Sequence, residues 1–229
     1  MQLSFGNKVF HFYRNLAPPA RLPKGVSAMN PYRKQTARGY IKEFLEKFFP
    51  DAEKRIFVFG INPGRFGAGV TGIAFTDPVA LANVCGVSND LAKRREVSSE
   101  FVYSFIEKWG GAGKFYRDFF LTAICPLGFV KNGINCNFYD DKKLLAAVRP
   151  FIAETIKAQI MCGARAGAAI VFGAGKNKKV FDELNAEHNF FKKVYALEHP
   201  RFIMQYRRRK LRAYLKKYHD VFSLALLSG

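Results

Sequence analysis

The feature that most constrains this chain is a short apolar run of the β type that stops abruptly in a glycine-rich turn. The run covers Arg55 to Ile61, and the turn begins with Asn62-Pro63-Gly64 and ends at Gly67. Proline fixes its own φ angle and glycine permits tight backbone paths, so the turn holds the asparagine in a defined place. In open α/β sheets, ligands bind at the carboxyl ends of such strands. We therefore expect a ligand site around Asn62.

The rest of the chain alternates between strand-like and helix-like segments. Further strands are predicted over 119–124, 168–172 and 194–197. Apolar residues at helical spacing predict helices over 38–49, 78–84, 98–109, 140–148, 150–161, 178–185 and 205–224, and Pro150 leaves open whether the fourth and fifth form a pair or one kinked helix. Strands that alternate with helices indicate a parallel sheet covered on both faces. The predicted fold class is α/β, a three-layer α/β/α sandwich around a central, mainly parallel sheet of four strands.

Length and composition fit one domain. The chain has 229 residues, 49% of them hydrophobic, which suffices for one sizeable core. It shows neither an internal repeat nor a linker. Pro18, Pro19 and Pro23 predict that residues 1–30 form an irregular arm. We expect a single domain over residues 1–229, and a monomer.

The charge of the chain is strongly positive. Its 37 Lys and Arg residues exceed its 18 Asp and Glu residues, giving a net charge of +19. This excess favours a polyanionic partner, either nucleic acid or an acidic membrane surface. We find neither a signal peptide nor an apolar stretch of the roughly 20 residues that span a bilayer. The expectation is a cytoplasmic or nuclear protein without a membrane-spanning segment, and the charge by itself leaves both kinds of partner open.

Cysteine and histidine positions give no sign of a metal site. Cys85, Cys125, Cys136 and Cys162 lack the C-x-x-C spacing of zinc or iron–sulfur ligands, and the four histidines lack ligand spacing as well. The cysteines are therefore interpreted as reduced thiols. We expect neither a metal nor another cofactor.

Polar residues stand at three places where strands end or loops follow. These are the turn at Asn62, the loop that contains Asn135 and Asn137, and His199-Pro200. Each alone is typical of an ordinary turn or strand exit. In a parallel sheet, however, the carboxyl ends of the strands share one edge, so the three should converge. Their coincidence predicts a site without a catalytic carboxylate.

The same residues resemble a known family. Asn62-Pro63-Gly64-Arg65-Phe66-Gly67, followed by Thr71-Gly72-Ile73-Ala74-Phe75, resembles motif one of the single-strand-selective monofunctional branch of the uracil-DNA glycosylase superfamily. Cys125-Pro126-Leu127 and the asparagine loop resemble its middle motif, and His199-Pro200 its motif two. The resemblance spans roughly 55–208. It implies a monofunctional enzyme of base excision repair that flips uracil out of DNA and hydrolyses its N-glycosidic bond.

The resemblance also implies roles for single residues. Asn62 would position the attacking water, and His199 would donate a hydrogen bond to the leaving base. Phe75 would stack on the flipped base. Asn135 would read the edge of the base, since an amide both donates and accepts, with Asn137 as the alternative because the loop is one residue shorter than the family pattern. The other residues expected around the substrate are Gly60, Ile61, Pro63, Gly64 and Phe66.

The residues expected to contact DNA include departures from the family pattern. They are Arg65, Arg201, Phe202, Arg207 and Arg208. Arg65 replaces a proline typical of the branch, and the segment after His199-Pro200 lacks the family's intercalating arginine. The residue that fills the space of the flipped base stays open among Arg201, Phe202, Met204 and Tyr206. Gly64 stands where branches that exclude thymine carry a bulky aromatic. We interpret the chain as a divergent subgroup whose substrates could include 5-substituted uracil or deaminated purines.

Other readings remain open. The first is a non-catalytic DNA-binding protein on a degenerate glycosylase scaffold. The second is a dinucleotide site, because Gly67, Gly69 and Gly72 match G-x-G-x-x-G. That motif requires its glycines at the end of a strand and a helix directly after them, whereas here Thr76-Asp77-Pro78 intervenes. A third is a lysine nucleophile that cleaves the DNA strand.

Overall fold

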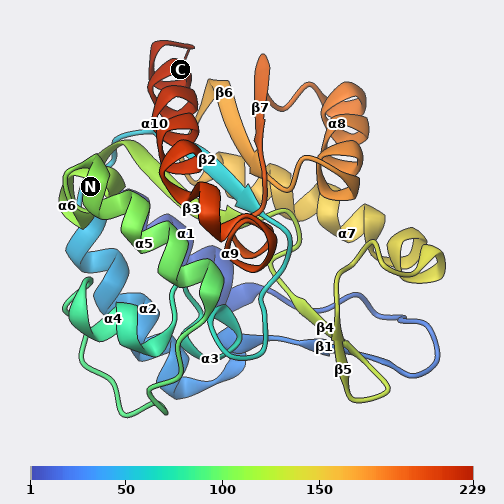
Figure 1. The fold of residues 1–229 in the computed structure, drawn as a ribbon. Coiled ribbons are helices and arrows are strands. Elements are labelled where there is room, and N and C mark those ends of the chain that lie inside the picture. Colours follow the sequence, from blue (N-terminus) through green and yellow to red (C-terminus); the bar gives the residue numbers. More distant parts are fainter. Residues whose placement is uncertain (1, 229) are drawn as a thin grey trace.

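The computed structural model describes residues 2–228 and places four parallel strands at the centre of the protein. In spatial order these are β3 (Phe119–Ala123), β2 (Arg55–Gly60), β6 (Ala164–Phe172) and β7 (Lys193–Leu197). Helices cover both faces of the sheet (Figure 1). The predicted α/β fold, with three layers around a four-stranded parallel sheet, is confirmed.

Ten α-helices and two 3-10 helices are found within residues 2–228. In chain order they are α1 (Phe5–Asn15), η1 (Pro31–Arg33), α2 (Gln35–Phe48), α3 (Ala68–Thr71), α4 (Pro78–Asn83), α5 (Val97–Trp109), α6 (Ala112–Asp118), α7 (Lys142–Met161), α8 (Lys176–His188), α9 (Pro200–Tyr206), η2 (Arg208–Lys210) and α10 (Leu211–Ser228). Pro150 lies inside α7, which continues through it as one helix. Over residues 2–228, we find no helix with both the length and the apolar character needed to cross a membrane.

Side chains of β2 alternate between the two faces of the sheet, and all six residues of the strand are buried. Phe57 and Phe59 point to the face covered by α1 and α8. Their rings lie 6.0 Å from Phe5 and 5.0 Å from Phe181, measured between ring centroids. Strands in parallel sheets are buried on both faces and therefore read as continuous apolar runs. This burial explains why Arg55–Ile61 stood out in the sequence.

The opposite face of the sheet packs against α5 and α10. Phe119 of β3 and Phe172 of β6 both contact Phe222 of α10, with ring centroids 4.8 Å and 6.2 Å apart. Trp109, the last residue of α5, packs edge-on against Phe119 at 5.5 Å. The buried apolar residues of both faces belong to one connected core.

A second, antiparallel sheet was not predicted from the sequence. Its order is β1 (Val26–Met29), β4 (Gly128–Lys131) and β5 (Ile134–Cys136). Asn132 and Gly133 join β4 to β5, and both have positive φ angles, 49° and 80°. A two-residue turn of this kind matches the twist of a β-hairpin. The hairpin matters for the site because it carries Asn135.

The expectation of an irregular arm over residues 1–30 was wrong for much of its length. Residues Phe5–Asn15 form α1, and Val26–Met29 form β1. The Ser4 hydroxyl accepts a hydrogen bond from the Asn7 N–H at 3.1 Å, which caps the helix. Phe5, Val9 and Tyr13, each four residues apart, bury one helix face. The prolines follow only after α1 has ended.

The single helix predicted over 205–224 is also different in the structure. The chain forms α9, then η2, and then α10. The His199 side chain caps α9, and Pro200 occupies its first turn. These two residues start a separate helix before the expected one. The change brings residues 201–206 onto α9, directly after His199.

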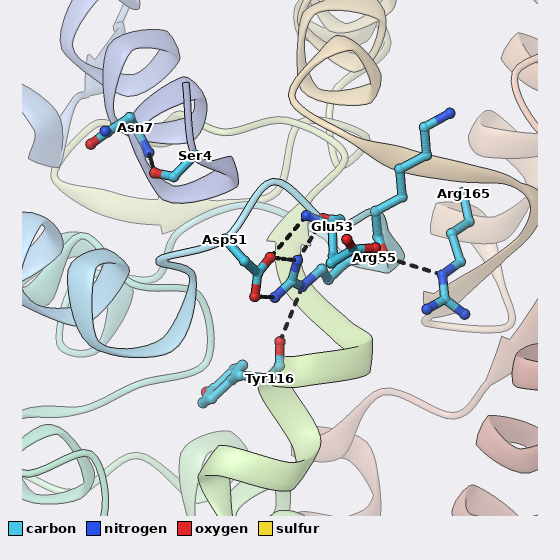
Figure 2. A network of polar contacts seen from close by, with 8 residues as sticks. Ser4, Asn7, Asp51, Glu53, Arg55, Tyr116 and Arg165 are labelled. Atoms are coloured by element: carbon cyan, nitrogen blue, oxygen red, sulfur yellow. Dashed lines mark hydrogen bonds and ion pairs between the residues drawn. The ribbon is translucent and has the colours of Figure 1, made fainter. Parts of the chain in front are cut away.

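The amino end of β2 holds a buried arginine in a closed polar network (Figure 2). Arg55 is only 1% exposed. Its guanidinium pairs with both carboxylate oxygens of Asp51, and Nε donates to the Tyr116 carbonyl at 3.4 Å. It also lies 5.3 Å and 5.5 Å from the ring centroids of Phe5 and Phe49. Burial of this charge is tolerated because it is paired and hydrogen-bonded.

Candidate active site

A cavity of about 170 Å³ opens at the carboxyl ends of β2 and β3. Among the residues expected around a substrate, it brings together Gly60, Ile61, Asn62, Pro63, Gly64, Phe75, Asn135 and His199. Phe66 is not among the lining residues. The convergence follows from topology, because β2, β3 and β7 all end at this edge of the sheet.

Asn62 directly follows β2, and the loop after β5 fixes its amide. Its Oδ1 accepts a hydrogen bond from the Phe138 N–H at 3.3 Å, and its Nδ2 donates to the Cys136 carbonyl at 3.5 Å. A carbonyl oxygen has two lone pairs, so Oδ1 retains one acceptor position. A water could be held there in a fixed direction. The orientation of Asn62 thus depends on the hairpin that carries Asn135.

The His199 ring is neutral at neutral pH, and its tautomer is set. Burial lowers its pKa from 6.5 to about 4, and the positive charge of Arg201 adds to this effect. Nδ1 accepts a hydrogen bond from the Arg201 N–H at 3.2 Å. A neutral imidazole has one donor and one acceptor nitrogen, so the proton resides on Nε2. The ring can therefore offer an N–H donor to a ligand in the cavity.

Phe75 presents a flat aromatic wall, and Gly60 makes room for it. The backbone of Phe75 is left-handed, with φ of 56°, a conformation rarely adopted by bulky side chains. Its ring packs edge-on against Phe172 at 5.3 Å. A methyl group in place of a Gly60 hydrogen would lie 2.6 Å from Phe75 Cζ. Gly60 therefore serves the site by admitting this ring.

Asn135 lines the cavity, and its side chain contains an unsatisfied polar atom. Its Oδ1 is buried, and no other atom of residues 2–228 donates a hydrogen bond to it. An unpaired buried acceptor costs about 1–3 kcal/mol, so such atoms are rare unless a ligand or a water pairs with them. Asn137 also lines the cavity. The free carbonyl favours Asn135 as the group that reads a ligand edge.

Two tyrosines of the cavity wall were missed by sequence reasoning. The rings of Tyr13 and Tyr32 stack in parallel, 4.2 Å apart and 5° from coplanar. Burial raises the pKa of Tyr13 to about 12 and that of Tyr32 well above 10, so both are neutral. The spacing of Phe5, Val9 and Tyr13 is typical of one face of a helix and is the sequence signal for α1. No local pattern indicated that either ring reaches the cavity.

The side chain of Glu96 was the third omission. It comes from the residue just before α5 and lines the same cavity. Burial and the nearby Asp77 raise its pKa, while Arg201 and the backbone amides of Gly67 and Phe66 lower it. The prediction from the sequence concerned a carboxylate with a catalytic role. A carboxylate that lines the cavity does not by itself contradict that prediction.

Two residues of the first turn face outward. Phe66 is 41% exposed, and the guanidinium of Arg94 lies 3.5 Å from its ring centroid. Arg65 donates from Nη1 to the Gly133 carbonyl at 3.0 Å, which ties the turn to the β4–β5 hairpin. The structure thus gives Arg65 a contact that the sequence did not explain. A role of Arg65 in DNA binding stays a prediction.

The residues after His199 are arranged on α9 and η2. Arg201 lines the cavity, while Phe202 is 40% exposed and carries the Arg207 guanidinium 5.4 Å from its ring centroid. Arg208 pairs with Glu100 of α5 at 3.2 Å. Arg201, Phe202 and Arg207 are therefore near the cavity or on a shared exposed cluster, whereas Arg208 is engaged within the protein.

Fold and site together define an α/β protein with a cavity at the carboxyl edge of its sheet, lined by aromatic and amide side chains. The family model described as Uracil DNA glycosylase superfamily matches residues 46–222. The chain belongs to the uracil-DNA glycosylase superfamily. It is also similar to SMUG2 of Pedobacter heparinus, whose crystal structure matches with a TM-score of 0.94 and 39% identity, over 97% of this chain and 98% of that one. A search of curated proteins found no match.

These comparisons confirm the resemblance to the superfamily and agree with the branch that motif one indicated. The family match begins at residue 46, so Tyr13 and Tyr32 lie outside it. The similarity to SMUG2, by contrast, extends over nearly the whole chain. Within residues 2–228, no cluster of three or more His, Cys, Asp or Glu side chains is placed to hold a metal ion.

Proposed function

We propose that this protein is a monofunctional DNA glycosylase that removes uracil, and related deaminated or 5-substituted bases, in base excision repair. The observation that carries the proposal is the convergence of Asn62, Phe75, Asn135 and His199 in one cavity at the carboxyl edge of the sheet. Membership in the superfamily supports it. A duplex base must leave the stack to enter such a pocket, so base flipping is part of the proposal.

In the proposed reaction, the bond between the sugar C1′ and the base nitrogen breaks, and its electron pair leaves with the base. The water held by Asn62 Oδ1 forms the new bond to C1′ and releases a proton to solvent. An amide is a weak base, but an electron-poor sugar carbon needs little activation of the water. No lysine bond to the sugar is involved, which is the sense of monofunctional.

His199 and Asn135 act on the base. Negative charge develops on the departing pyrimidine, and the His199 Nε2–H donates to the oxygen where that charge collects. The free Oδ1 of Asn135 accepts the ring N–H, and its Nδ2 can donate to a neighbouring carbonyl. Phe75 stacks on the ring face. A neutral donor suits this role because its proton is available over the whole range above pH 4.

Binding to DNA rests on charge. The net charge of +19 and the exposed Arg207 and Phe202 cluster support contact with the phosphate backbone. Arg201, Phe202, Met204 and Tyr206 remain the candidates for the side chain that fills the vacated base position. Met204 is the weakest of them, since it is only 6% exposed.

The test is excision from uracil-containing oligonucleotides, single- and double-stranded, followed by alkaline cleavage of abasic sites. We expect abasic product from the wild type and a rate about 100-fold lower for Asn62→Ala, in the range found when a group that positions the reaction is removed. Asn83→Ala, at an exposed residue of α4, is the matched control. Tight DNA binding without abasic product would favour the non-catalytic alternative. Trapping with borohydride would reveal a lysine nucleophile.

A further inference from the structure

Glu96 is a carboxylate in the cavity wall that the proposed reaction does not use. It precedes α5, and its backbone N–H donates to Asp77 Oδ2 at 2.9 Å. Asp77 in turn caps α4 through Oδ1, which accepts from the Val79 and Ala80 N–H groups. The Glu96 backbone is therefore anchored to two helix starts. These backbone contacts leave the Glu96 carboxylate available to contact the neighbouring turn.

The carboxylate of Glu96 lies directly against the turn that carries Asn62. A methyl group in place of a Gly67 hydrogen would be 2.3 Å from Oε2, and one on Gly64 would be 3.3 Å from Oε1. The two glycines thus admit the carboxylate to the backbone of the turn. Residues with a side chain at position 67 would displace it.

The charge environment of this carboxylate comes from three segments. The backbone amides of Phe66 and Gly67 lower its pKa and oppose the effect of burial. The Arg201 guanidinium adds a favourable charge from α9, whereas Asp77 adds an unfavourable one. Arg201 also supplies the backbone N–H that fixes the His199 tautomer. Glu96 therefore stands between the Asn62 turn and the His199 segment.

We propose that Glu96 is a positioning residue, whose carboxylate holds the Gly64–Gly67 turn through its backbone amides and links that turn to Arg201. The proposal rests on the proposed glycosylase function for its effect on rate. Its structural content is independent of that function. Glu96 acts through Asn62 and His199 and does not touch the reacting atoms.

The structural content is tested by hydrogen exchange of backbone amides. In Glu96→Ala, the amides of Phe66 and Gly67 should exchange roughly tenfold faster or more, as expected when hydrogen bonds to a charged acceptor are lost. Amides of β2 and β6 should keep their protection. Glu96→Gln retains one acceptor oxygen, so its exchange rates at Phe66 and Gly67 should lie between those of the wild type and those of Glu96→Ala. Unchanged exchange at Phe66 and Gly67 in Glu96→Ala would overturn the proposal, whether or not the protein excises any base.

The effect on rate is tested by single-turnover excision with enzyme in excess. Glu96→Ala should lose roughly tenfold or more in rate while DNA affinity stays within about threefold, and Glu96→Gln should recover part of the loss. Glu107→Gln, at an exposed position of α5, the helix that Glu96 precedes, makes the same charge change as Glu96→Gln and should leave the rate unaltered. Equal losses in Glu96→Gln and Glu107→Gln would contradict a positioning role. A wild type without activity on any base would refute the proposed function, and the exchange data would still decide the role of Glu96.

A double-mutant cycle links the carboxylate to the glycine beside it. Gly67→Ala alone should disturb the turn, because its methyl group would overlap Glu96 Oε2. In the Glu96→Ala background the same change should increase amide exchange less, since the overlapping atom is gone. Backbone strain at position 67 is present in both backgrounds and cancels in the comparison. Additive effects of the two changes would count against the contact.

Discussion

Buried polar groups near the two ends of strand β2 differ in whether they have hydrogen-bond partners. At the amino end, the buried Arg55 has partners in Asp51 and the Tyr116 carbonyl. At the carboxyl end, Asn135 keeps an unpaired buried oxygen. His199 there is held neutral although its ring could carry a charge.

This contrast separates a structural network from a candidate binding site. A closed network lowers the free energy of the folded chain, because every buried polar atom it contains is satisfied. A network with unpaired donors and acceptors can bind a ligand through them. Without the ligand, the protein is less stable than it would be if those groups were paired. The contrast predicts that mutations at the two ends affect different quantities, one stability and the other excision.

The largest effect is expected at the amino end. Asp51→Ala leaves the Arg55 charge buried without its counter-ion and should lower the free energy of unfolding by about 3–5 kcal/mol. Urea denaturation measures this change. Asp220→Ala removes a carboxylate from an exposed pair with Lys216 and should cost no more than about 0.5 kcal/mol. The excision rate of the folded Asp51→Ala protein should stay unchanged.

His199→Ala should be the most damaging change at the carboxyl end. Loss of the Nε2–H donor should lower the single-turnover excision rate by about 10²–10³-fold, the range for removal of one donor to a developing anion. His199→Asn keeps a side chain that can cap α9 and should show a similar loss of rate with less effect on stability. A near-normal rate in both variants would show that His199 does not act on the base.

The two ends should also respond to pH in different windows. The unfolded His199 ring takes up a proton below pH 6.5 and the folded ring only near pH 4, so the unfolded chain gains stability as the pH falls between these values. Protonation of His199 in the unfolded chain should lower the free energy of unfolding by about 3 kcal/mol as the pH falls through this window, at ~1.4 kcal/mol for each unit of pKa. The difference between wild type and His199→Ala in urea denaturation isolates it.

Asp51 has a lowered pKa, caused first by its hydrogen bond to Arg55. Its contribution to stability is present above the unfolded value of 3.8 and is lost as the pH falls through the lower folded value. The stability of Asp51→Ala should therefore change less than that of the wild type below pH 4. Coincident windows for the two residues would contradict the separation between the ends.

Asn135→Ala should lower the excision rate without lowering stability, which separates the two quantities at the carboxyl end. The variant removes the buried unpaired oxygen, so the free energy of unfolding should stay the same or rise by up to about 1 kcal/mol. Excision should nevertheless fall by about 10–100-fold, since a base N–H would lose its acceptor. Asn137→Ala, two residues further along the chain, is the control and should retain most of the rate. A larger loss of excision rate in Asn137→Ala than in Asn135→Ala would indicate that Asn137, and not Asn135, binds the edge of the base.

The smallest effect is expected on the outer surface. Arg207→Ala should weaken DNA binding uniformly across sequences and reduce the slope of log Kd against log salt by about 1. Fluorescence anisotropy at several salt concentrations gives this slope. Arg149→Ala removes the same charge from α7, where Glu187 already pairs it, and should leave the slope nearly unaltered.

The sequence was a good guide where local patterns are strong. Continuous apolar runs revealed the four strands of the parallel sheet, and Asn62 and Phe75 of motif one both line the cavity at its edge. It was a poor guide where partners are distant. The N-terminal helix and the β4–β5 hairpin went unpredicted, although Ser4 and Asn132-Gly133 carried capping and turn signals for them.

By itself, the sequence determined the class of fold, the superfamily and the net charge that favours DNA. These depend on residue type and on spacing within single segments, which a sequence displays directly. Only the tertiary structure decided which nitrogen of His199 carries the proton, that Asn135 keeps a free oxygen, and that Glu96 reaches the Asn62 turn. Those properties arise from burial and from contacts between segments far apart in the chain, because desolvation and hydrogen-bond geometry exist only once the chain has folded.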